Sequence, residues 1–128
     1  MLFSLSTDKP LAAVSEALQA AVLARKFGVM LVYDIPQVME KKGVSFEREC
    51  LIFEICEPHH AKEVLYSDMR IATALPCRIA LYREGDRTVL ASLRPTLLLQ
   101  MFNVPALAHI AEEIEEAIKA MMQDAVDA

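Results

Sequence analysis

The sequence lacks several features that mark common functional classes. It has only three glycines, Gly28, Gly43 and Gly85, and they are too far apart to form a glycine-rich loop that cradles phosphate groups. No apolar run approaches the roughly 18 residues that a membrane-spanning helix requires. These absences argue against a phosphate-binding loop and against a membrane partner.

Clustered positive charge is also missing. The formal net charge is -5 at pH 7, and adjacent basic residues occur only as the pairs Arg25-Lys26 and Lys41-Lys42. Binding to nucleic acid depends on groups of Lys and Arg that neutralise phosphates. We therefore expect no nucleic-acid partner, and each pair is more simply explained as the end of a helix, where positive charge favours the helix dipole.

Cysteine is sparse and scattered. The three cysteines, Cys50, Cys56 and Cys77, form no Cys-x-x-Cys motif and are more typical of reduced thiols than of a disulfide framework. The N-terminal stretch Met-Leu-Phe-Ser-Leu-Ser-Thr-Asp has neither the basic start nor the extended apolar region of a secretory signal. Together these observations predict a cytoplasmic location.

Hydrophobic residues, in contrast, are abundant. They make up 55% of a 128-residue chain that has no internal repeat and no linker, so we expect one domain over residues 1–128. This share is high for a soluble protein, and the excess predicts a subunit interface in addition to a core. A homodimer is the simplest assembly that would bury it.

The hydrophobic periodicity predicts an α+β fold, with a mostly antiparallel sheet of about five strands and helices packed on one face. Polar Arg83–Arg87 with its glycine predicts a hairpin between the last two strands. The expected strands are Leu2–Ser6, Val29–Tyr33, Glu49–Ile55, Cys77–Tyr82 and Thr88–Leu93, and the expected helices are 10–25, Gln37–Lys42, Pro58–Tyr66, a turn over Thr96–Met101 and a long helix after Asn103.

Several details follow for the helix ends and faces. Gly28 is expected to end the first long helix, and Asn103 is expected to cap the last one, with Pro105 in its first turn. Along that last helix Glu115 and Lys119 have the spacing of a favourable ion pair. Four acidic residues are expected to face water, namely Glu112, Glu113, Glu115 and Glu116.

Three short motifs carry a resemblance. The run Gly28–Ile35, the tripeptide Cys56-Glu57-Pro58 and the tripeptide Leu75-Pro76-Cys77 precede an amphipathic final helix. In this order they resemble the domain-of-unknown-function 302 family, over about Thr7 to Met122. The resemblance implies a compact α+β domain, grouped with the TATA-box-binding-protein-like folds and usually self-associating, and it implies no known reaction.

Glu57 departs from that family pattern, which typically has Asn between the Cys and the Pro. Asn is a strong helix cap, whereas Glu caps poorly. We therefore expect either a weaker start to the helix that follows or a different partner for Glu57.

The two motif cysteines allow two interpretations. Cys56 precedes a helix N-terminus, where the dipole and free N–H groups could lower the pKa of its thiol. Alternatively, Cys56 and Cys77 are small apolar residues packed at sheet edges, since free cysteines are most often packed apolar residues. A ligand or thiol site would comprise Cys56, Glu57, Pro58, Cys77 and Asp34.

A metal site is a weaker hypothesis, and no cofactor is expected. Thiolate and imidazole groups suit zinc or copper, but the spacing of these residues does not require a metal. His59 and His60 are expected to be exposed, and Asp34 is most simply a turn residue that binds local N–H groups. The candidate ligands are Cys56, His59, His60 and Cys77.

Two functional hypotheses remain open. The favoured one is a non-enzymatic, homo-oligomeric binding module for an unknown small ligand or protein partner, with Cys56 and Cys77 lining its pocket. The alternative is a thiol redox or metal-thiolate protein that uses the same two cysteines.

Overall fold

Five strands form one sheet in the order β1-β5-β4-β3-β2, and every neighbouring pair is antiparallel. The computed structural model describes residues 1–128. None of its helices is both long and apolar enough to cross a membrane. The strands are β1 Leu2–Thr7, β2 Gly28–Asp34, β3 Cys50–Cys56, β4 Cys77–Glu84 and β5 Arg87–Leu93; the helices are α1 Leu11–Ala24, α2 Ile35–Lys41, α3 Pro58–Ser67, α4 Pro95–Gln100 and α5 Ala108–Asp127, with 3-10 turns η1 Met69–Ala74 and η2 Pro105–Leu107.

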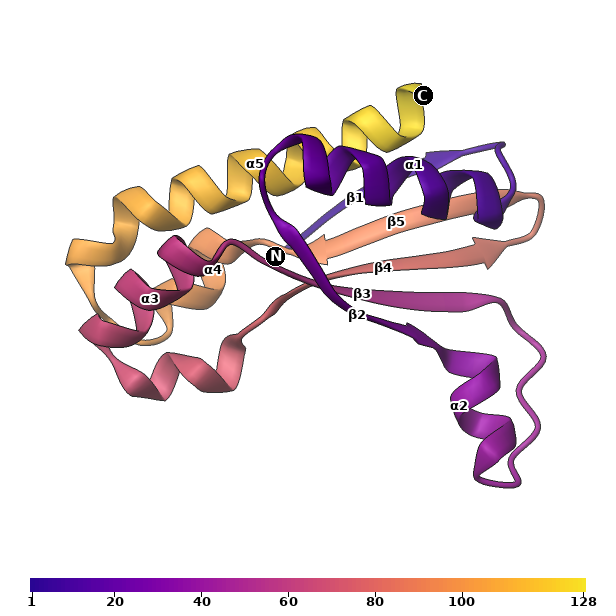
Figure 1. Ribbon diagram of the computed structural model, residues 1–128, viewed down its shortest axis with the longest axis horizontal. Helices are drawn as coiled ribbons and strands as arrows, with labels where there is room; N and C mark the ends of the chain where they lie inside the picture. The colour runs from indigo at the N-terminus through magenta and orange to yellow at the C-terminus, as the bar shows by residue number, and fades with distance from the viewer.

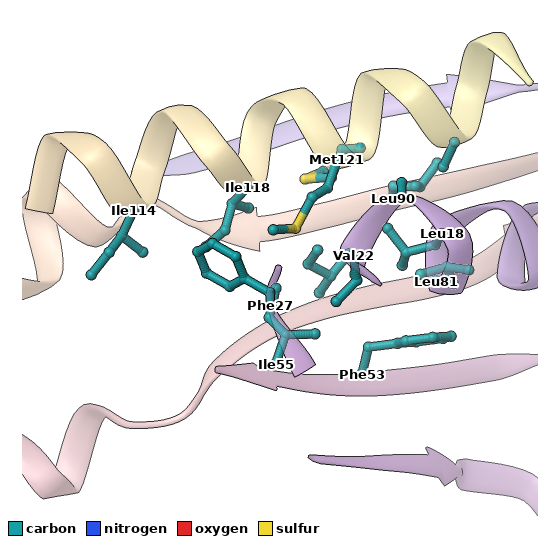
Figure 2. Packing of buried hydrophobic residues seen from close by; sticks show 14 of the residues in the cluster. Leu18, Val22, Phe27, Phe53, Ile55, Leu81, Leu90, Ile114, Ile118 and Met121 are labelled. Carbon is teal, nitrogen blue, oxygen red and sulfur yellow. The ribbon is translucent and has the colours of Figure 1, made fainter. Parts of the chain in front are cut away.

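Helices α1 and α5 lie side by side over one face of the sheet (Figure 1). Their apolar residues recur every three or four positions and therefore form one stripe that packs on the strands. Figure 2 shows the resulting core between the two helices and β3, β4 and β5. The predicted α+β class and the single helical layer are confirmed. The labelled core residues are Leu18, Val22, Phe27, Phe53, Ile55, Leu81, Leu90, Ile114, Ile118 and Met121.

The interior of the sheet follows the sequence closely. Strand β3 lies between β4 and β2, as is typical of a strand with apolar residues on both faces. Strands β4 and β5 form the predicted hairpin, and Glu84 pairs with Arg87 across a turn in which Gly85 has a φ of 61°. Residues that carry a side chain rarely adopt a positive φ, which explains why glycine occupies this position.

Two predicted helix ends are wrong. Helix α1 ends at Ala24, and Gly28 belongs to β2; the left-handed residue after the helix is Lys26, with a φ of 64°. This turn lets the N–H of Phe27 bind the carbonyl of Val22 while the Phe27 ring enters the core. Asn103 caps no helix.

Asn103 instead takes a left-handed φ of 55° in the turn after α4. The 3-10 turn η2 intervenes before α5, which starts at Ala108 and has no side-chain cap. The proline that was expected in the first turn of the long helix therefore starts η2.

The prediction that Glu115 faces water is also wrong, because this residue is buried and only 5% exposed. Its carboxylate accepts hydrogen bonds from the Thr96 hydroxyl at 2.6 Å, from the Thr96 N–H and from Arg94, and it pairs with Lys119 at 3.3 Å, as predicted. These contacts fasten the start of α4 to α5. Glu112, Glu113 and Glu116 do face water.

Candidate functional site

The stretch from Cys56 to His60 is a strand-to-helix junction. Cys56 ends β3, Glu57 is the N-cap of α3, and Pro58 is its first residue. The two carboxylate oxygens of Glu57 accept hydrogen bonds from the backbone N–H of His59 at 3.1 Å and of His60 at 2.8 Å. The expectation of a weak cap is therefore wrong, because the longer Glu side chain folds back and satisfies both free N–H groups.

The capping contacts also set the acidity of Glu57. Partial desolvation raises its pKa, but the His59 ring, whose Nδ1 lies 2.7 Å from Oε1, and the backbone N–H groups of His60 and His59 outweigh it. The pKa of Glu57 falls from 4.5 to about 2. The junction thus carries a fixed negative charge at neutral pH.

We expect acid to weaken this junction. Because the folded pKa of Glu57 lies below its usual value, its stabilising effect is complete above about pH 4.5 and is lost as the pH falls toward 2. Urea unfolding should show that Glu57→Gln loses less stability than the unsubstituted chain between pH 6 and pH 3. Glu63→Gln, on the exposed side of α3, is the matched control. Equal losses in all three proteins would contradict this role.

Cys56 and Cys77 lie together, at the adjoining ends of β3 and β4. They line one small cavity with apolar residues from α3, α5 and the turn before β2, and its volume of about 20 Å³ is close to that of a single water. The lining includes Phe27, Ile55, Val64, Leu75 and Ile114. The structure therefore brings the two motif cysteines together around one small space.

Both thiols are less acidic than a free cysteine. Burial, and then the negative charge of Glu57, raises the pKa of Cys56 above 9.0. Burial, and then the proximity of Cys56, raises the pKa of Cys77 to about 11, although Arg78 opposes this rise. These directions are opposite to the shift expected from a helix N-terminus, and they fit the packed interpretation of the cysteines.

The two histidines differ in exposure. The His59 side chain is 93% exposed, as predicted, but that of His60 is only 25% exposed, which corrects the sequence prediction. The ring of His60 packs near that of Phe27, with the ring centroids 5.9 Å apart. Its Nδ1 has no hydrogen-bond partner, and its two ring nitrogens lie 3.6 Å from Glu57 and Glu113.

The remaining predicted site residues do not join this cluster. Asp34 pairs in register with Leu51, at the opposite end of β2 from the pairing of Gly28 with Cys56. It caps α2 by accepting a hydrogen bond from the Gln37 N–H at 3.3 Å, which is the turn role that the sequence indicated. No three His, Cys, Asp or Glu side chains converge in a way that could hold a metal ion.

A larger hollow, which sequence reasoning missed, lies on the sheet face that α1 and α5 leave open. Its volume is about 480 Å³, and ten of its fifteen lining residues are hydrophobic. Ala80 and Ala91 lie opposite each other on β4 and β5 and make part of its lining, while α4 and η1 flank it. We call it the sheet hollow; its lining includes Leu2, Ile52, Ala74, Pro76, Cys77, Arg78, Ala80, Ala91, Leu93, Leu98, Met101 and Phe102.

A single ion pair lies beside the hollow. Glu54 and Arg78 are direct partners on β3 and β4, and Arg78 Nη2 lies 3.0 Å from Glu54 Oε2. Arg78 is the only charged residue that lines the hollow, and its side chain is 54% exposed. The sequence offered only a weak signal for the hollow, namely one small residue in each of two strands, Ala80 and Ala91, which leave room where larger side chains would fill it.

The comparisons with known proteins agree on one family. A family model described as a domain of unknown function, DUF302, matches residues 3–125. The crystal structure of an uncharacterized conserved DUF302 protein from Bacillus stearothermophilus is similar, with a TM-score of 0.90 and 27% sequence identity over 97% of each chain. No curated protein matches the sequence. The chain belongs to the DUF302 family.

Proposed function

We propose that this chain is a non-enzymatic binding module that acts as a homodimer and holds its ligand in the sheet hollow, with Cys77 in the wall. The observation that carries the proposal is the hollow itself. Its volume of about 480 Å³ lies within the range of roughly 300–1,000 Å³ that is common for small-molecule sites. Such sites are mostly apolar with few polar groups, as this one is.

The lining favours an apolar molecule with one acidic group. Leu98, Met101 and Phe102 offer an apolar wall. Arg78 directs Nε and Nη2 at Glu54, at 3.1 Å and 3.0 Å, while Nη1 makes no hydrogen bond. A carboxylate could occupy that free donor, and charge-assisted hydrogen bonds of this kind are among the stronger ones.

The raised pKa values of the cysteines favour a structural role for these residues in the module. A thiol whose pKa lies above 9.0 is protonated at neutral pH, and the thiol form is a poor nucleophile. All three cysteines are free, which suits the reducing cytoplasm where we place the protein.

Calorimetric titration with decanoate tests the ligand site. Decanoate should bind, and Ala80→Leu should weaken its affinity about tenfold or more, because the added methyl groups occupy the hollow. Ala12→Leu, on an exposed position of α1, is the matched control and should leave the affinity unchanged. Decanol should bind less tightly, since it offers no charge to Arg78. If Ala80→Leu and Ala12→Leu bind decanoate with equal affinity, any decanoate site lies outside the sheet hollow.

One observation favours the second candidate, a thiol redox or metal-thiolate protein: Cys56 and Cys77 share a cavity. Proximity alone would permit a disulfide or a shared metal ion. The raised pKa values weigh against it because metal binding and thiol exchange both use the thiolate. Thiol reactivity therefore separates the two candidates.

A further inference from the structure

The outward face of the sheet is unusual for a surface in contact with water. An antiparallel sheet with helices on one side normally presents polar residues on the other. Here the rows opposite the helices are mostly apolar, and Leu2, Leu31 and Leu93 are 64%, 45% and 46% exposed. The apolar outward residues include Leu2, Leu31, Tyr33, Ile52, Ala80, Tyr82, Val89, Ala91 and Leu93, while the polar ones are Ser4, Ser6, Glu54, Arg78, Glu84 and Arg87.

We propose that a second copy of this chain covers this face, sheet against sheet, about a twofold axis close to the Glu54–Arg78 pair. The inference rests on the homodimer of the proposed function and names its interface. In such a dimer the sheet hollow becomes an enclosed chamber, so that a ligand would lie between the two copies.

The charges on the face match those of a second copy. Each chain carries a net charge of -5, so two copies repel at long range. The face itself holds one acid and one base near its centre, Glu54 and Arg78, and is neutral there. A twofold axis places each half-exposed Arg78 near the Glu54 of the partner subunit, whereas a strongly charged partner would find no matching charge.

The size of the face is adequate for a dimer. Five strands about 4.8 Å apart and about six residues long, at about 3.3 Å each, give roughly 500 Å² in plane. Side-chain relief and the flanking elements add to this, toward the roughly 800 Å² per partner of a standard interface. Exposed Met101 and Leu2, at the border of the hollow, add apolar surface to this contact.

Helix α2 offers a second, independent observation. It extends from the sheet on the side away from α1 and α5 (Figure 1), and it has no buried residue. Apolar Val38 is 38% exposed, and Val44 just beyond the helix is 52% exposed. A helix without a buried face gains little stability alone, and a second copy seated on the sheet would supply the missing contact.

The other route to a dimer, addition of a strand at the β2 edge, fits less well. The pairing of β2 with β3 shifts register between Val29 and Leu31, which bulges the strand at Met30. Bulges twist an edge strand and blunt its pairing with another chain. The face therefore suits a second copy better than the β2 edge does.

Sedimentation equilibrium of the full chain tests the interface. We expect a dimer with a Kd of about 1 µM or tighter, and Val89→Glu should raise this Kd at least about 100-fold, because Val89 lies outward in the sheet but does not line the hollow. Ala20→Glu, on an exposed position of α1, is the matched control and should remain dimeric. Circular dichroism must show that the variants are folded.

A mixing experiment identifies the central pair. The Arg78→Glu variant carries two acidic residues at the pair, and the Glu54→Arg variant carries two basic residues, so each alone should be monomeric. An equimolar mixture should form a heterodimer, because the opposite charges then face each other. A dimer that survives Val89→Glu, or folded charge variants that never pair, would overturn the interface.

The two proposals fail separately. If decanoate binds but the dimer survives Val89→Glu, only the interface is contradicted. If Val89→Glu dissociates the dimer but the chain binds no decanoate, only the ligand site is contradicted. A chain that stays monomeric at all accessible concentrations would contradict the interface and the homodimer together.

Discussion

Replacing Glu115 by alanine should lower the free energy of unfolding by about 3 kcal/mol, since charged hydrogen-bond partners contribute about 1.5–3 kcal/mol each and several are lost together. The Glu115 carboxylate accepts hydrogen bonds from Arg94 and Thr96 and forms an ion pair with Lys119, and the residue is only 5% exposed. Half-exposed Arg94 can regain water after the substitution, which keeps the loss below the sum of the individual bonds. Urea unfolding at neutral pH measures the effect.

Two further variants make the Glu115 result specific. Glu116→Ala, exposed on the same helix, should change stability by no more than about 0.5 kcal/mol. Glu115→Gln keeps an acceptor for Thr96 but loses the charge, so its loss should be intermediate. A loss below about 1 kcal/mol in Glu115→Ala would contradict the account. Since α4 forms a wall of the sheet hollow, decanoate affinity should fall as well.

Cys77 should react with iodoacetamide at least about tenfold more slowly than free cysteine at neutral pH. Its pKa of about 11 leaves about 100-fold less thiolate than the usual 9.0, and higher intrinsic nucleophilicity offsets only part of this difference. Mass spectrometry of alkylated peptides gives a separate rate for each cysteine.

Cys56 provides the discriminating comparison, because it directly precedes the N-cap of α3. We expect Cys56 also to react more slowly than free cysteine from about pH 5 to about pH 9, since its pKa is raised as well. A reaction rate at Cys56 above that of free cysteine would support the thiol redox or metal-thiolate candidate. It would contradict the structural role of the cysteines in the proposed binding module.

The fold could be predicted because its determinants are local and periodic. Alternation in Thr88–Leu93 and helical spacing from Leu11 to Val22 specify which faces are buried, and the glycine between Glu84 and Asp86 specifies a turn. Helix ends were less predictable because they depend on tertiary contacts. Lys26 adopts a left-handed conformation so that Phe27 can enter the core, and no local rule assigns that conformation to lysine.

The candidate site could be predicted only in part. The tripeptide motifs located the β3–α3 junction and paired Cys56 with Cys77, but the burial of His60 and Glu115 depends on packing between elements far apart in sequence. The sheet hollow depends on strand order: Ala80 and Ala91 become neighbours only when β4 and β5 pair. A small residue in one strand predicts no cavity until its partners are known.

A titration of the isotope-labelled chain with decanoate, followed by two-dimensional amide NMR, tests the central claim most directly. The account predicts that the shifted amides cluster on β4, β5 and α4, around Ala80, Ala91 and Leu98, and leave the exposed residues of α1 unchanged. Shifts confined to the junction at Cys56, or no saturable shift at any site, would contradict a ligand site in the sheet hollow.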